Sequence, residues 1–213
     1  MPTSIQQLLL TKRFEPEIIP TLEDHLRAQC EQQTYDKEAN LALLKLYQFH
    51  PTQTKLDVVS LLLLKSLMHL PNNDYRMCTY LCSEQIFSDP TVVAIVQAAS
   101  HLEKCAFRSF WAHLASSLTE LIPTIAGFEE AIRTFMLDTM QCLYQSVPIA
   151  HVRESLNVND SSLKPIIEAR SWAVDGEIVK IPLNENNQAR PQTIEQGSID
   201  AQQMVQMLRT SFM

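Results

Sequence analysis

The sequence of 213 residues predicts a mostly α-helical protein, and three patterns along the chain support this fold class. Apolar residues recur at helical spacing from residue 21 to about residue 144, without strand-like alternation. Prolines at positions 51, 71, 90 and 123 divide this part into segments of helix length. Closer to the C-terminus, two short helical patterns are followed by a hairpin pattern and then by a last helical pattern.

Residues 1–146 are predicted to form stacked helical hairpins. Helices are expected over residues 38–49, 58–68, 91–103, 104–118 and 128–144. The first of them has Leu43 and Leu46 on one face and Leu41 and Leu44 on another, so it needs neighbours on two sides. Such helices are typical of the inner members of HEAT-like arrays. Since no repeated sequence signature is present, the stack is inferred from helix number and connection length.

Residues 147–183 are predicted to form a small winged-helix module. Two helical segments, IAHVRESL and SSLKPIIEARSW, are joined by the turn-rich NVNDS, in which Asp160 or Ser161 is placed to cap the second helix. The segment WAVDGEIVKIPL follows, and its Asp175-Gly176 pair is a hairpin signal between alternating residues. Two helices followed by a two-stranded wing make a winged helix.

The C-terminal end of the chain is predicted to be a linker and a helix. Residues 184–197 are polar and include one proline, Pro191, and one glycine, Gly197, which favours a linker. Residues 198–213 place Ala201, Met204, Val205 and Leu208 at the spacing of one helix face. Because this face is apolar, we expect it to pack against a partner surface.

Composition and charge exclude several classes of protein. The formal net charge is −7, so the phosphate backbone of a nucleic acid is repelled on average. The predicted winged helix itself carries four basic and five acidic side chains, where a DNA-binding module is normally basic. The three glycines are scattered, so no glycine-rich nucleotide loop is expected. The densest apolar run, residues 58–64, is far shorter than a membrane span, and we expect a cytoplasmic protein without a membrane anchor.

No metal, cofactor or catalytic site is expected from the reactive side chains. The five cysteines suit a reducing compartment, and Cys78 and Cys82 have no second ligand pair nearby that would complete a zinc site. A thiolate enzyme would need Cys82 or Cys105 beside a histidine such as His113, but no local signature supplies an orienting residue or an oxyanion hole. We therefore expect a protein that is not an enzyme.

A protein-binding role is the prediction that remains, and two features could serve it. The hairpin offers an edge at residues 177–181, and the last helix offers its apolar face. The alternative is that both pack on their own domain. The candidate partner-binding residues are Trp172, Val174, Ile178, Ile181, Met204, Val205 and Leu208.

Three segments resemble the subunit K family of eukaryotic translation initiation factor 3. The segment YDKEANLALLKLYQFHP, residues 35–51, is the most specific of them. SFWAHL, residues 109–114, and GFEEAIRTF, residues 127–135, are similar to the helices that follow in the family, in the same order. The resemblance covers nearly the whole chain and is weak in residues 71–103 and after residue 182.

The resemblance implies a HEAT-like domain and a winged helix in a PCI-like arrangement, without catalytic residues. It also implies a scaffold subunit that pairs with subunit L and engages the small ribosomal subunit through its complex during translation initiation. One alternative is a PCI-type subunit of another assembly, such as the proteasome lid or a signalosome-like complex. A cysteine-dependent enzyme and a direct RNA-binding protein are the alternatives from other classes.

Overall fold

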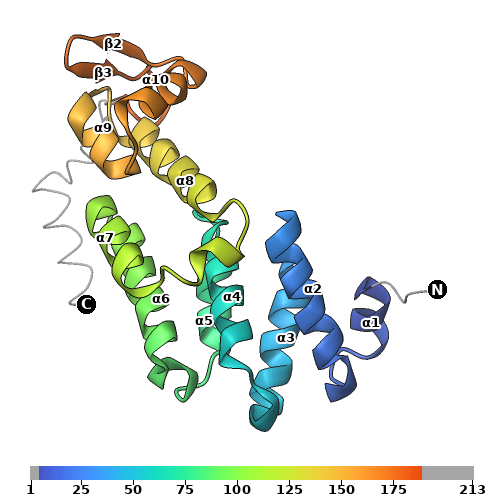
Figure 1. Cartoon of the computed structure of the whole chain (residues 1–213). Coiled ribbons are helices and arrows are strands. Elements are labelled where there is room, and N and C mark those ends of the chain that lie inside the picture. The colour runs from blue at the N-terminus through green and yellow to red at the C-terminus, as the bar shows by residue number, and fades with distance from the viewer. Residues whose placement is uncertain (1–4, 189–213) are drawn as a thin grey trace, which may run out of the picture.

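The computed structural model describes residues 5–188, and within them the predicted mostly α-helical fold is confirmed (Figure 1). The stacked helices are α1 (Ile5–Thr11), α2 (Ile19–Gln32), α3 (Lys37–Phe49), α4 (Leu56–Leu67), α5 (Asp74–Leu81), α6 (Pro90–Glu103), α7 (Phe107–Ser117) and α8 (Phe128–Leu143). Then follow β1 (Ser146–Pro148), α9 (Ile149–Leu156), α10 (Asp160–Ala169), β2 (Ala173–Asp175) and β3 (Ile178–Lys180). Short 3-10 helices cover Pro16–Ile18, Pro51–Gln53, Ile86–Ser88 and Ile122–Thr124.

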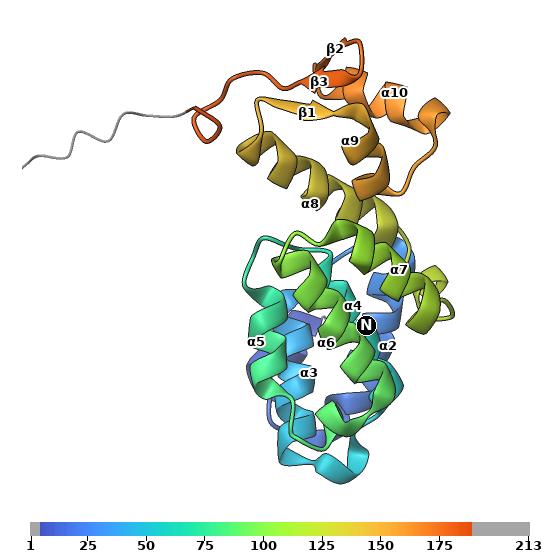
Figure 2. The same ribbon diagram turned by 90° about the vertical axis from the view of Figure 1, so that its left-hand side faces the viewer.

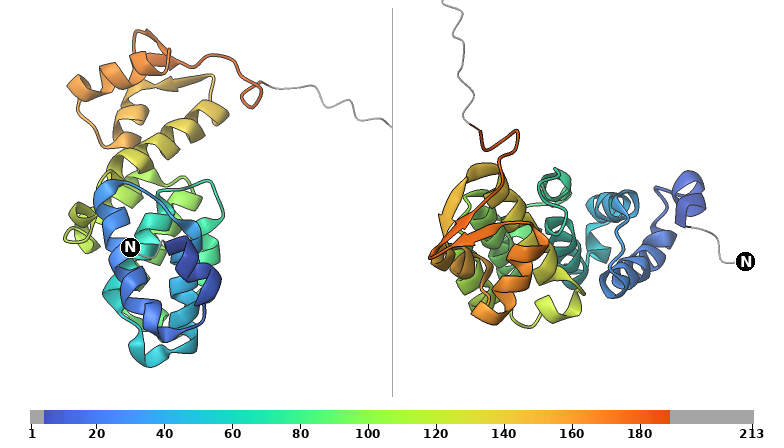
Figure 3. Two further views of the ribbon diagram at one scale, coloured as in Figure 1. Left: turned by 90° about the vertical axis from the view of Figure 1, so that its right-hand side faces the viewer. Right: turned by 90° about the horizontal axis from the view of Figure 1, so that it is seen from above.

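The helices from α1 to α7 lie side by side, and the sheet-bearing part lies at the end of the stack opposite α1 (Figures 1 and 3). We call this part, residues 146–181, the C-terminal module. In Figure 2 the module lies above α7 and next to α8, with β2 and β3 at the end away from the stack. A long helix, α8, therefore joins the stack to the module.

Helix α4 is the most buried element of the stack. Its leucines Leu62, Leu63 and Leu64 are fully buried, because α2, α5 and α6 all pack against it. The prediction that the helix over residues 38–49 needs neighbours on two sides is confirmed, because α3 packs against α2 and α5. The prolines also act as predicted, since Pro90 opens α6 behind the Asp89 cap, whose carboxylate accepts from Thr91 N at 2.9 Å.

A buried carboxylate ties three parts of the stack together. Glu23 on α2 accepts a hydrogen bond from the Tyr47 hydroxyl of α3 at 2.7 Å and one from the Lys55 amine at 2.5 Å. Lys55 immediately precedes α4. Beside them, the buried amides of Gln29 and Asn40 form two reciprocal hydrogen bonds between α2 and α3. These polar contacts fix the register of the three helices, since a shift along any axis would leave buried groups unpaired.

The start of α7 and the cap of α10 differ from the prediction. The helix expected over residues 104–118 begins at Phe107, because Cys105 adopts a positive φ of 54° and turns the chain between α6 and α7. The predicted cap of α10 by Asp160 or Ser161 was wrong: Asn159 occupies the capping position and its side chain makes no capping bond. The Asp160 carboxylate binds Arg153 at 3.0 Å instead.

The sheet of the module has three strands in the order β1-β3-β2, both pairs antiparallel. The sequence predicted two strands and missed β1. The predicted hairpin edge at residues 177–181 was also wrong, because β3 is the central strand and β1 and β2 are the edges among the described residues. The turn is one residue later than expected, with Asp175 paired to Ile178 and Gly176 at φ +62° in the first turn position.

The stack and the module are joined by side chains that cap a helix end. The last carbonyl groups of an α-helix lack partners within the helix. At the end of α9, Ser155 O accepts from the Trp111 indole of α7 at 2.8 Å, and Leu156 O accepts from the Arg133 Nε of α8 at 3.1 Å. The Arg133 guanidinium also lies 5.1 Å from the Trp111 ring centroid. One compact cluster thus holds α7, α8 and α9 together.

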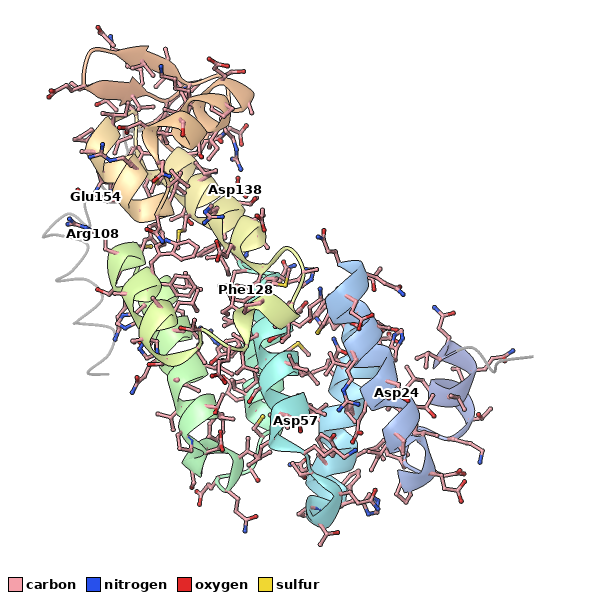
Figure 4. The ribbon with its side chains drawn as sticks, viewed as in Figure 1. Asp24, Asp57, Arg108, Phe128, Asp138 and Glu154 are labelled. Atoms are coloured by element: carbon pink, nitrogen blue, oxygen red, sulfur yellow. The ribbon has the colours of Figure 1, made fainter. Side chains whose placement is uncertain are left out.

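Two charged pairs support this junction from outside. Arg108 of α7 binds Glu154 of α9 at 2.8 Å, and Arg170 binds Asp138 of α8 at 2.5 Å. Arg108, Glu154 and Asp138 are labelled in Figure 4, which shows the first pair between the end of α7 and α9. The Arg108–Glu154 pair is exposed, so it adds about 1 kcal/mol at most, whereas the Arg170 side chain of the second pair is only 24% exposed.

The segment after the module is hydrogen-bonded to the end of α8. Asn187 is buried, and its amide donates to Tyr144 O at 3.1 Å and to Pro182 O at 3.0 Å. Asn184 donates to Gln141 O at 2.8 Å. The first residues of the predicted linker therefore cap the C-terminal carbonyls of α8.

We expect the Glu23→Ala substitution to lower the free energy of unfolding by about 2–3 kcal/mol, because the buried Tyr47 hydroxyl and the Lys55 amine lose their acceptor. Urea unfolding measures this change. The matched control is Asp24→Ala, which removes the neighbouring carboxylate, 79% exposed and labelled in Figure 4. The control should change stability by about 0.5 kcal/mol or less. Equal losses in both variants would contradict a structural role of Glu23.

We expect Trp111→Phe to cost about 1–2 kcal/mol, since it leaves the buried Ser155 carbonyl without its donor. The same unfolding experiment measures it. Arg108→Gln, which breaks only the exposed pair with Glu154, serves as the control and should cost about 0.5 kcal/mol or less. A Trp111 variant as stable as the control would show that the indole hydrogen bond does not hold the junction.

Candidate docking site on the C-terminal module

The four candidate residues of the hairpin fall into two groups. Trp172 and Ile181 are 5% and 4% exposed and belong to the core of the module. Val174 and Ile178 are 53% and 45% exposed. The other three candidates, Met204, Val205 and Leu208, lie outside the described residues. Of the candidates that the structure places, only Val174 and Ile178 present substantial apolar surface.

Val174 and Ile178 lie on opposite faces of the sheet. Val174 pairs directly with Val179, which is fully buried, whereas Ile178 pairs with Asp175. Directly opposed residues of an antiparallel pair point to the same face, and successive residues alternate. Val174 therefore lies on the face that meets the helices, at its open margin. Ile178 lies on the outer face near the ion pair of Lys180 with Asp175, so the two cannot form one contact patch.

Val174 borders an apolar hollow of about 510 Å³ between α10 and the sheet. Its apolar walls come from Ile149, Leu163, Ile167, Trp172 and Val174, and its charged rim from Asp160, Lys164 and Glu168. The sequence placed none of the α10 residues in a site. The signal was present in the spacing of Leu163 and Ile167, four residues apart on one helix face.

The Trp172 indole lies beneath this hollow with a hydrogen-bond donor unused. Its Nε1 is buried and has no hydrogen-bond partner within residues 5–188. A buried donor without an acceptor costs about 1–3 kcal/mol. The accessible lining itself is mainly apolar with a charged rim, which is the composition of a site for an apolar side chain.

The charges of the module disfavour a nucleic-acid phosphate. Three of its four basic side chains already bind carboxylates: Arg153 with Asp160, Arg170 with Asp138, and Lys180 with Asp175. A surface that attracts phosphate groups needs uncompensated positive charge. The second helix of the module, α10, therefore lacks the basic surface of a DNA reader.

The buried cysteines are poor nucleophiles. Burial raises the pKa of the Cys78 thiol to about 11 and that of Cys82 to about 12, and it also raises the pKa of Cys30. Little thiolate is then present at neutral pH. Cys82 follows the end of α5 and its thiol donates to the Cys78 carbonyl, while His113 binds the Ala94 carbonyl. Cys82 and His113 therefore do not form a thiol activated by a neighbouring base.

Residues 5–188 contain no group of three or more His, Cys, Asp or Glu side chains placed to hold a metal ion. None of the helices in this range has both the length and the hydrophobicity required to cross a bilayer.

Comparisons with known proteins agree on one family. The profile described as the CSN8/PSMD8/EIF3K family matches residues 53–193. The chain is 34% identical to eukaryotic translation initiation factor 3 subunit K of Aedes aegypti over 185 residues, which are 86% of this chain and 83% of the relative. It is 35% identical to the protein of the same name from Nematostella vectensis over 174 residues, 81% of this chain and 80% of the relative.

The subunit K of Drosophila erecta shows the same relationship over a longer range. It is 33% identical to the chain over 193 residues, which cover 90% of this chain and 86% of the relative. These ranges exceed two thirds of both proteins, and the profile covers more than half of the chain. The resemblance to subunit K is thereby confirmed, and the chain belongs to the CSN8/PSMD8/EIF3K family.

Proposed function

We propose that the chain is a non-catalytic scaffold subunit of the eukaryotic translation initiation factor 3 complex. In this role it helps to assemble the translation pre-initiation complex, with subunit L as a main partner and the small ribosomal subunit reached through the complex. The names of its relatives support this assignment. The cytoplasm is then its place of action, and it needs no cofactor and no direct, specific contact with nucleic acid.

The single structural observation that supports this proposal is the apolar hollow of the C-terminal module. The exposed side chain of Val174 beside apolar walls that include Trp172 would suit an apolar side chain of a partner, inserted between α10 and β2. Interface energy is concentrated in such buried aromatic anchors.

The arrangement of elements supports the finer description of the fold. The order α9, α10, β2, β3, with β1 completing the sheet, suits a winged helix. The preceding helices pack in successive pairs, α2 with α3, α4 with α5 and α6 with α7, and α4 also contacts α2 and α6 of the neighbouring pairs, which suits a HEAT-like stack. Both observations support the PCI-like arrangement that the family resemblance implies, with a HEAT-like domain at residues 1–146 and a winged-helix module at residues 147–183.

We expect Val174→Asp to reduce co-purification of the chain with subunit L and the initiation factor complex at least tenfold, because it puts a charge at the margin of the apolar hollow. Ile178→Asp is the matched control, since Ile178 is similarly exposed on the opposite face of the same hairpin. Circular dichroism verifies the fold of both variants. Full recovery of the complex with folded Val174→Asp would refute docking at the hollow.

The apolar face of residues 198–213 needs its own experiment. We expect truncation before Ser198, or the substitution Leu208→Asp, to lower the stoichiometry of the chain in its purified complex, because either change removes the stripe of Met204, Val205 and Leu208. Quantitative mass spectrometry of the affinity-purified complex measures the ratio of subunits. An unchanged ratio in both variants would contradict docking through this stripe. If the proteins recovered were those of the proteasome lid or a signalosome-like complex, the alternative assembly would replace the initiation factor.

A further inference from the structure

A second hollow lies in the helical stack, away from the C-terminal module. It has a volume of about 550 Å³ and opens where the end of α2, the end of α4 and the start of α8 meet. Phe128, labelled in Figure 4, is the first residue of α8 at this place. The lining residues are Gln33, Lys65, Met68, His69, Gly127, Glu130, Ala131 and Thr134.

Lys65 is a buried cation without a counter-ion. The residue is 1% exposed, lines the hollow, and makes no hydrogen bond or ion pair within residues 5–188. Burial lowers its pKa, as expected for an amine that is removed from water. A buried charge is normally paired, so an amine that borders an open hollow is available to a bound anion.

Two more nitrogen groups border the same space. The side-chain amide of Gln33 and the imidazole of His69 make no hydrogen bond within the described chain, although the His69 ring stacks on Tyr35 at 3.7 Å. Burial, and after it the charge of Lys65, lower the pKa of His69. The imidazole carries at least one N–H donor in either protonation state.

The N-terminal end of α8 adds a positive electrostatic potential that favours a bound anion. Its 16 residues begin after Gly127, which has no side chain to cap the first turn. The N-terminal end of a helix carries partial positive charge and free N–H groups. Glu130 is the one carboxylate that lines the hollow, and its side chain is 77% exposed, 4.0 Å from Arg133. No ion pair joins Glu130 to Lys65 within residues 5–188.

We propose that this hollow binds a small oxyanion, a phosphate or a carboxylate group, with Lys65 as its counter-ion and Gln33 and His69 as hydrogen-bond donors. The apolar and small walls given by Met68, Gly127 and Ala131 leave room for the rest of a small molecule. Such a site adds ligand binding to a chain whose proposed role is structural, and it lies on the stack instead of the docking hairpin.

The test is an NMR titration of the isotope-labelled full chain with inorganic phosphate and, separately, with acetate, against sodium chloride of equal ionic strength. We expect a saturable shift of the Lys65 side-chain resonances with phosphate, acetate or both, and a higher Lys65 pKa in the bound state, because the anion favours the charged amine. Whichever probe saturates assigns the class of oxyanion. No saturable shift with either probe beyond that of chloride would overturn the proposal.

Matched variants separate binding from a change in fold. Lys65→Met should lower the affinity at least tenfold and should still fold, since an apolar side chain of similar length replaces an unpaired buried charge. Gln33→Gly removes the amide while keeping the positive φ of 56° at this position, and should lower the affinity severalfold. Lys104→Met, at an exposed lysine, is the control and should leave binding unchanged. Equal affinities in Lys65→Met and in the control would overturn the proposal.

Discussion

The hydrogen bond from the Trp111 indole to the Ser155 carbonyl is the contact on which the geometry of the whole chain depends. Together with the hydrogen bond from Arg133 to the Leu156 carbonyl, it gives the C-terminal carbonyl groups of α9 partners from α7 and α8. Because a helix end buried without partners is costly, the module cannot rotate away from the stack without losing these bonds. The segments SFWAHL and GFEEAIRTF, which belong to the family resemblance, supply Trp111 and Arg133. Residues of the family resemblance therefore hold the module on the stack.

Sequence periodicity predicted a helix well where apolar residues recur clearly at helical spacing. The segments around Leu43, Leu62 and Ile132 became α3, α4 and α8 within one or two residues. It failed for features that depend on a contact with residues far away in the chain. The strand β1 has three residues and exists because β3 pairs with it from 32 residues further along the chain. The contact of Lys55 with Glu23 is likewise separated by 32 residues and leaves no local pattern.

The candidate docking residues show the same limit. Alternation in WAVDGEIVKIPL correctly indicated a hairpin, yet it could not say which face is covered. That depends on packing within the module, in which Trp172 and Val179 are buried and Val174 stays exposed at the margin of the hollow beside α10. The turn lies at Gly176 and Glu177 and not at Asp175-Gly176, and a shift of one residue in a strand exchanges its faces.

The asparagines after the module have a consequence for the rest of the chain. Asn184 and Asn187 fasten the backbone to the end of α8, so residue 188 is held beside the module. Under the proposed docking, a partner bound at the hollow would meet Met204, Val205 and Leu208 as part of the same chain, which raises their effective concentration for that partner. Two weak contacts would in this way act as one strong one, and cleavage of the chain between residues 188 and 198 would weaken association without changing the hollow.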